Sequence, residues 1–122
     1  MITYASVVVE LVNFIPEYKS SESWKEVSDN SDLPYIVFGN LYAWTIENIK
    51  LGQILLVQKV LNFIQEIACI NENKLDELIM FGFLENIDES KNADKIIIKM
   101  LKKETRQLYL QMIAHNDRLQ NT

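Results

Sequence analysis

The side chains best suited to nucleophilic or metal chemistry are the only cysteine, Cys69, and the only histidine, His115. A cysteine–histidine pair catalyses only when the two side chains touch and a third group orients the histidine. Cys69 stands in an apolar stretch that predicts a buried helix position, where a thiol is inert. Zinc sites need several ligands at close spacing, and neither residue has such neighbours. We therefore expect no metal site, no cofactor and no catalysis by this pair.

Carboxylates are numerous and fall into three groups along the chain. Paired carboxylates perform general acid–base catalysis when burial separates their pKa values. These acids instead fall at the ends of predicted helices and in loops, where helix capping and a solvated surface explain them more simply. An acidic surface that binds a partner is the alternative. The groups are Asp29 with Asp32, Glu72 with Asp76 and Glu77, and Glu85 with Asp88 and Glu89.

A basic segment near the C-terminal end carries lysines and an arginine at helical spacing between residues 95 and 106. Such cations could follow the phosphates of a nucleic acid. Isoleucine, methionine and leucine are interspersed with them, and an amphipathic helix lying on the core explains this pattern better. No glycine-rich phosphate-binding loop of either common pattern occurs. We therefore expect no nucleic-acid partner.

The composition indicates a soluble globular protein. The chain has 122 residues, of which 48% are hydrophobic and 24% charged, with only three glycines and two prolines. Few turn residues favour few, long elements over a sandwich or barrel. A single cysteine, no basic leader and no long apolar run predict a cytoplasmic protein without a membrane-spanning segment. Residues 1–90 have a net charge of −9 and residues 91–122 a net charge of +4, so the acidic part would attract a basic protein.

Hydrophobic periodicity predicts one all-α domain over residues 1–122, built as a bundle of about five antiparallel helices, with residues 118–122 frayed. Asp32 is expected to cap the second main helix and Pro34 to lie in its first turn. Asn73 is expected to cap the fourth helix, and Gly82 to allow a neighbouring helix to approach closely. The five main helices are expected at residues 3–15, 34–51, 53–70, 73–84 and 92–117, with a short helix near 23–28.

Three apolar stretches carry a family resemblance. They are Leu-Pro-Tyr-Ile-Val-Phe-Gly-Asn-Leu at 33–41, Val-Leu-Asn-Phe-Ile-Gln-Glu-Ile at 60–67 and Gly-Phe-Leu-Glu-Asn-Ile at 82–87. With them the chain resembles small bacterial immunity proteins of polymorphic-toxin and contact-dependent growth inhibition systems. The resemblance implies an all-helical fold that neutralises a cognate toxin domain. It carries no shared catalytic residues, so we expect no enzymatic activity.

A binding function therefore follows as the expectation from sequence. The partner is expected to be a toxin domain, most simply a nuclease with a basic substrate cleft, to which an acidic inhibitor would be steered. A helical adaptor domain for another host protein is the main alternative, a carboxylate enzyme is another, and a homodimer stays open. We expect neither a nucleic acid nor a membrane as partner. The expected partner-binding residues are an acidic rim and an aromatic anchor, made of Trp24, Asp29, Asp32, Trp44, Glu85, Asp88 and Glu89.

Overall fold

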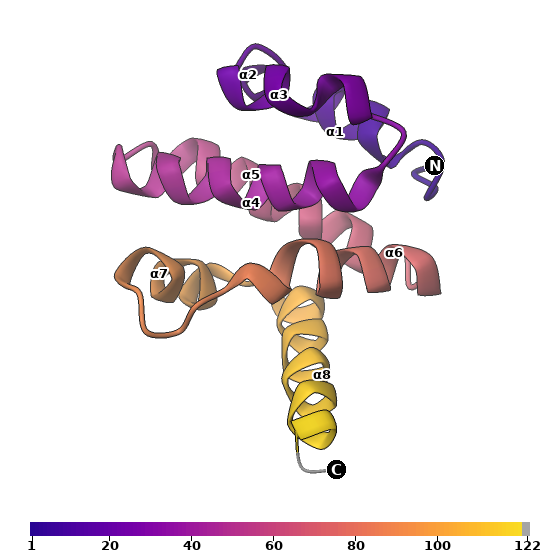
Figure 1. Cartoon of the computed structure of the whole chain (residues 1–122), viewed down its shortest axis with the longest axis vertical. Coiled ribbons are helices and arrows are strands. Elements are labelled where there is room, and N and C mark those ends of the chain that lie inside the picture. Colours follow the sequence, from indigo (N-terminus) through magenta and orange to yellow (C-terminus); the bar gives the residue numbers. More distant parts are fainter. Residues whose placement is uncertain (121–122) are drawn as a thin grey trace.

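The computed structural model describes residues 1–120, and every regular element in that range is helical (Figure 1). The predicted all-α single domain is confirmed, but the expected count of five helices is wrong. Within residues 1–120, eight α-helices are interrupted by one π-helical and two 3₁₀ segments. The α-helices are α1 (Val7–Phe14), α2 (Pro16–Lys19), α3 (Glu22–Val27), α4 (Pro34–Lys50), α5 (Ile54–Ala68), α6 (Asn73–Leu78), α7 (Asn92–Met100) and α8 (Lys103–Gln120). The others are η1 (Ser28–Asn30), η2 (Ile79–Phe83) and η3 (Leu84–Asn86).

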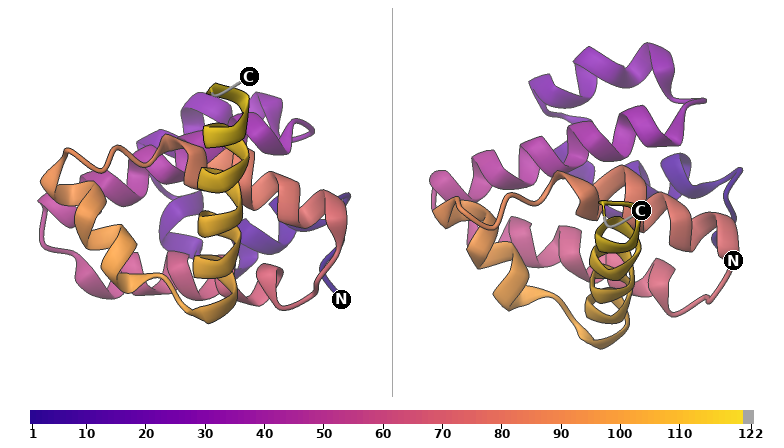
Figure 2. Two further views of the ribbon diagram at one scale, coloured as in Figure 1. Left: turned by 90° about the horizontal axis from the view of Figure 1, so that it is seen from below. Right: turned by 60° about the horizontal axis from the view of Figure 1, so that its bottom comes forward.

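Helices α4 and α5 form the centre of the molecule, and the other elements cover them. Helices α1 to α3 lie on one side of this pair, while α6, η2 and α7 lie on the other (Figure 1). Val37 and Phe38 of α4 and Ile64 and Ile67 of α5 are fully buried in one continuous core. Helix α8 packs against α5 and η2, and its C-terminal end projects away from the body (Figures 1 and 2). No helix within residues 1–120 combines the length and apolar content that crossing a bilayer requires.

The predicted last helix is in fact two helices. Leu101 adopts an extended conformation, with φ −60° and ψ 132°, and separates α7 from α8. Its side chain is buried at 4% exposure, and the guanidinium of Arg106 donates a hydrogen bond of 2.9 Å to its carbonyl oxygen. Burial of Leu101 thus stabilises the break between the two helices, and α8 runs in a different direction from α7.

The helix starts agree with the sequence only in part. Pro34 lies in the first turn of α4 as predicted, but the N-cap position is Leu33 and no side chain caps it, so the role expected of Asp32 is wrong. At α6 the N-cap is Glu72, one residue before Asn73. The carboxylate of Glu72 accepts a hydrogen bond of 2.8 Å from the backbone N–H of Leu75. The Glu72 side chain thus reaches forward to an N–H of the first turn, the kind of group that shorter capping residues bind.

The expectation for Gly82 is confirmed. A Cβ atom built on Gly82 would lie 3.1 Å from Cδ1 of Leu78, 3.4 Å from Cβ of Phe38 and 3.5 Å from Cδ1 of Tyr35. Phe38 and Tyr35 belong to α4, so the glycine allows η2 to approach α4 closely. The amide of Asn86 then ends this turn by donating to the carbonyl oxygens of Gly82 and Phe83 at 3.0 and 3.1 Å.

The side chain of Gln65 joins α5 to the start of α8. Its Oε1 accepts hydrogen bonds from the backbone N–H and the hydroxyl of Thr105, at 3.1 and 2.8 Å. Its Nε2 donates to the carboxylate of Glu104. Thr105 is 1% exposed, so this contact satisfies one of the N–H groups that a helix start leaves without an intrahelical partner.

We predict that Gln65→Leu lowers the free energy of unfolding by about 1–3 kcal/mol, because the buried N–H and hydroxyl of Thr105 lose their acceptor. Urea unfolding measures the loss, and hydrogen exchange should show faster exchange at the start of α8. Gln58→Leu is the matched control, because Gln58 is an exposed residue of the same helix. Equal losses in the two variants would contradict a specific role for Gln65.

Candidate functional site

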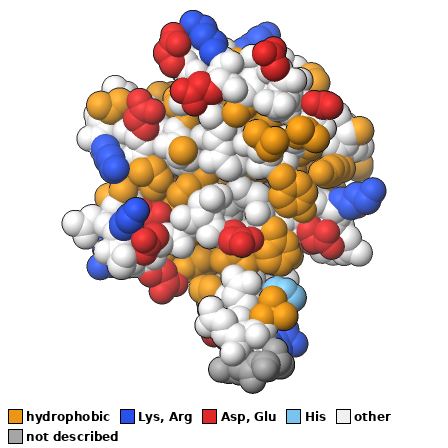
Figure 3. Space-filling view, viewed as in Figure 1, with side chains coloured by type: hydrophobic (Ala, Val, Ile, Leu, Met, Phe, Trp, Pro, Cys, Tyr) orange, Lys and Arg blue, Asp and Glu red, His pale blue; other side chains and the backbone are white. Residues whose placement is uncertain are grey.

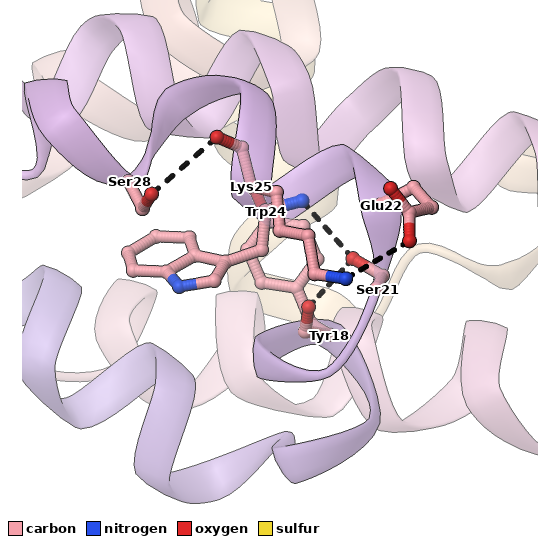
Figure 4. Close-up of polar contacts among 6 residues, drawn as sticks. All are labelled: Tyr18, Ser21, Glu22, Trp24, Lys25 and Ser28. Atoms are coloured by element: carbon pink, nitrogen blue, oxygen red, sulfur yellow. Dashed lines mark hydrogen bonds and ion pairs between the residues drawn. The ribbon is translucent and has the colours of Figure 1, made fainter.

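The two tryptophans expected at a partner interface belong to an aromatic cluster that fastens α2 and α3 to α4. The Tyr18 ring lies 5.7 Å from that of Trp24 and 5.1 Å from that of Trp44. Trp44 is only 7% exposed and Trp24 is half-buried. Ser21 caps α3 by accepting a 3.1 Å hydrogen bond from the backbone N–H of Trp24, and its hydroxyl donates to the Tyr18 carbonyl at 2.6 Å (Figure 4).

Tyr18 completes the cluster from inside the core. Its side chain is fully buried, and its hydroxyl donates a 2.5 Å hydrogen bond to Oδ1 of Asn40 on α4. Burial raises the pKa of this hydroxyl well above its usual value, so it stays a donor. Because Trp44 packs against this ring in the core, we do not include it in a binding surface.

The five acids expected to form one rim are divided between two places. Asp29 lies in η1, and Asp32 lies two residues before the start of α4. Asp88 instead lines a hollow beside Ala43 and Lys50, in the C-terminal half of α4. Helix α4 has 17 residues, so its ends lie roughly 25 Å apart. The other two acids, Glu85 and Glu89, are exposed and close to Asp88 in the sequence.

The first place is an acidic and apolar surface at the start of α4, which we call the α4-entry surface. It consists of Asp29, Asp32, Leu33, Tyr35 and Ile36. Both acids are exposed, and the three apolar residues are 46%, 40% and 47% exposed, in that order. Figure 3 shows hydrophobic side chains gathered over the start of α4, with acidic side chains nearby. Large apolar groups that remain in solvent beside charges are typical of protein-binding surfaces.

Tyr35 is the residue of this surface with the most structured surroundings. It borders a hollow of about 280 Å³ together with Tyr4, Lys74 and Glu77. Burial, followed by the proximity of Tyr4 and Glu77, raises the pKa of the Tyr35 hydroxyl. Tyr35 is not among the site residues expected from sequence. Apolar residues nevertheless cover more than one side of this helix. That excess of apolar residues was the available signal.

The second place is a hollow of about 720 Å³ between α4 and the start of α7, which we call the Tyr42–Asp94 hollow. Tyr42 and Asp94 are only 5% and 4% exposed and form its buried wall, whereas Lys50, Asp88 and Lys91 are exposed at its rim. The remaining lining residues are Gly39, Ala43, Ile46, Asn86, Ser90, Asn92 and Ala93.

Asp94 is the buried acid that sequence reasoning missed. Its Oδ2 accepts hydrogen bonds from the Tyr42 hydroxyl and, at 3.1 Å, from the backbone N–H of Asp88. Burial first, and then the bond to Asp94, raises the pKa of the Tyr42 hydroxyl. Its position in the sequence was the available signal for burial. Asp94 lies three residues before the buried Ile97, and Ile97 lies four residues before the buried Leu101, so the three share one side of the predicted helix. This placement puts Asp94 on the core side of α7.

The other acids near the hollow are engaged locally. Oδ1 of Asp88 accepts hydrogen bonds from the N–H and the hydroxyl of Ser90, at 3.0 and 2.6 Å, and these bonds lower the pKa of Asp88. Glu89 accepts a 2.5 Å hydrogen bond from the Tyr109 hydroxyl of α8. Both contacts hold the 88–91 loop in place. Glu85, the third acid of this group, is exposed and has no side-chain hydrogen bond to any residue within 1–120.

Cys69 and His115 do not form a catalytic pair in the structure. Cys69 caps the end of α5 and is exposed, so the expectation that it is buried is wrong. Its Sγ accepts a weak hydrogen bond of 3.4 Å from Gln65. His115 is exposed on α8, with its ring 5.8 Å from that of Phe81. Within the described part of the chain, no three histidines, cysteines or acids are grouped to hold a metal ion.

The structure is thus a small all-helical domain that carries these two surfaces. Residues 8–117 match the model of a protein family described as a domain of unknown function, DUF7674, and the chain belongs to that family. The match runs from α1 into α8 and includes both surfaces. Comparison with curated proteins gave no match, and comparison with solved structures gave none either.

Proposed function

We propose that the protein is an immunity protein that binds a cognate bacterial toxin domain through the α4-entry surface and masks the toxin's substrate-binding surface. The observation that supports this proposal is the exposure of Leu33, Tyr35 and Ile36 beside Asp29 and Asp32. In such an arrangement the apolar group supplies the central contact and the acids supply steering and specificity.

The physical requirements of inhibition agree with this surface. A stable interface buries roughly 800 Å² of accessible surface on each partner. This protein exposes 7086 Å², so such an interface would cover only a small part of its surface. A nuclease toxin presents a basic cleft to its substrate, so an acidic inhibitor would be attracted to it over several ångströms of solvent. The net charge of −5 adds to this attraction. Tyr35 is suited to be the anchor, because a tyrosine contributes a large rigid contact with a polar end.

The test begins with the product of the gene immediately upstream, since immunity genes stand beside their toxin genes. Co-purification of the two proteins and rescue of growth on co-expression are the expected results. A toxic upstream product that neither binds the protein nor is rescued by it would contradict the proposal. A non-toxic binding partner would favour the adaptor alternative.

Charge reversal at the α4-entry surface then tests its role. We predict that Asp29→Lys with Asp32→Lys slows association about 10- to 100-fold at low salt and weakens its salt dependence, because the steering charges are inverted. Stopped-flow or surface-plasmon kinetics measure both effects. Glu47→Lys with Glu66→Lys is the control, because these exposed acids lie elsewhere and produce the same change in net charge. Equal slowing in the two double variants would mean that net charge alone matters.

A further inference from the structure

We propose that the Tyr42–Asp94 hollow is a second binding site, which takes the guanidinium or ammonium end of a ligand whose outer end is neutral or acidic. The site goes beyond the proposed toxin-binding surface, because none of its lining residues belongs to the α4-entry surface. Its volume of about 720 Å³ is within the usual range of ligand sites, roughly 300–1,000 Å³. The hollow is therefore large enough for an arginine-sized group.

The buried carboxylate of Asp94 gives the hollow its chemistry. Asp94 is 4% exposed and lines the hollow. Both of its hydrogen bonds end on Oδ2, from Tyr42 and from the N–H of Asp88. Among residues 1–120, Oδ1 of Asp94 has no hydrogen-bond partner. It still has some contact with solvent, because it is not one of the fully buried polar atoms that lack a partner. Because Asp94 lines the hollow, we infer that this oxygen accepts a hydrogen bond from a donor bound there.

The donor that fits best is cationic. A hydrogen bond to a carboxylate is roughly twice as strong from a charged N–H donor as from a neutral one. Asp88 adds a second carboxylate at the rim, where its Oδ1 is held by Ser90. Gly39, Ala43, Ile46 and Ala93 supply small or apolar wall positions, against which the methylene chain of an arginine or lysine side chain can lie.

Lys50 and Lys91 determine what the outer end of the ligand can be. Both are exposed and line the same hollow. A cation bound at Asp94 lies at the buried wall, whereas a second cation at the rim would meet these two ammonium groups. A carboxylate or a neutral amide at the rim would be favoured instead. The site should therefore prefer N-acetyl-arginine, with one cation and one anion, to agmatine, with two cations.

Titration of the full chain by two-dimensional NMR tests the proposal with N-acetyl-arginine, agmatine and an end-capped peptide whose only charged side chain is one internal arginine. We expect N-acetyl-arginine to shift the amide signals of residues 42–46 and 88–94 with saturation, and agmatine to bind at least fivefold more weakly. Asp94→Asn should weaken binding about 10- to 100-fold, because the asparagine oxygen can keep both internal hydrogen bonds while the charge is lost. Ala43→Trp, at an exposed position on the wall, should fill the hollow and abolish binding even if Asp94→Asn does not fold.

The probes also distinguish the source of the cation. Binding of free N-acetyl-arginine without the peptide indicates a small-molecule site, whereas binding of the peptide indicates that the hollow holds a side chain of a protein partner. Three results would overturn the proposal: no saturable shift with any probe, unchanged affinity in both variants, or tighter binding of agmatine than of N-acetyl-arginine. A failure of toxin binding would leave these results unaffected, because they require no toxin.

Discussion

Substitution of Gly82 by valine is expected to lower the free energy of unfolding by about 3 kcal/mol, through overpacking between η2 and α4. Even a bare Cβ at this position would lie 3.1 Å from Cδ1 of Leu78 and 3.4 Å from Cβ of Phe38. Leu78 can adjust its flexible end, but the Cβ of Phe38 moves only with the backbone of α4. The two added methyl groups of valine would therefore force η2 and α4 apart.

Urea unfolding followed by circular dichroism measures this loss, and Gly82→Ala should give an intermediate decrease of about 1 kcal/mol. Gly39→Ala is the matched control, because Gly39 lies on α4 opposite the same segment. A Cβ there would meet only the Gly82 carbonyl oxygen, at an ordinary 3.9 Å. That variant should gain up to about 1 kcal/mol from the better helix propensity of alanine. An unchanged Gly82→Val, or a loss of stability in Gly39→Ala, would contradict this account.

The contrast between Gly82 and Leu101 illustrates what the sequence could predict of the fold. A glycine within an apolar helix is a local signal with one common physical cause, and the close approach at Gly82 was predicted from it. The break at Leu101 has no such signal, because the chain there contains no glycine or proline and its apolar spacing continues. Its cause is tertiary: burial of Leu101 and the bond from Arg106 outweigh the helix propensity of the residues around it.

The same distinction applies to the surfaces. The exposed acids Asp29 and Asp32 could be chosen from sequence because charge predicts exposure. Trp44 is expected from sequence as an aromatic anchor of the interface, but tryptophan is also frequent in cores, and only packing against Tyr18 decides between the two. An acid is usually expected at the surface, but Asp94 is buried. Its hydrogen-bond partners, Tyr42 and Asp88, come from distant or irregular segments of the chain. No pattern within α7 alone identifies those partners.

The pair formed by Tyr42 and Asp94 should also show strong energetic coupling. We expect Asp94→Ala to lower the free energy of unfolding by about 2–4 kcal/mol, because the buried Tyr42 hydroxyl and the Asp88 N–H lose their shared acceptor. Tyr42→Phe should cost about 1–2 kcal/mol. It keeps the ring, whose edge-on contact with Phe83 at 5.2 Å is unchanged. Asp94→Asn should cost less than Asp94→Ala, since its oxygen can still accept both bonds.

A double-mutant cycle isolates the contact between the two side chains. In a protein that already carries Tyr42→Phe, the change Asp94→Ala no longer leaves a buried hydroxyl without a partner, so its cost should fall by about 1–2 kcal/mol. Chemical denaturation of the four proteins at one pH gives the coupling. Additive losses would mean that Tyr42 and Asp94 stabilise the fold independently. Strong coupling would mean that the buried wall of the hollow forms as one unit, held together by the bond from Tyr42 to Oδ2 of Asp94.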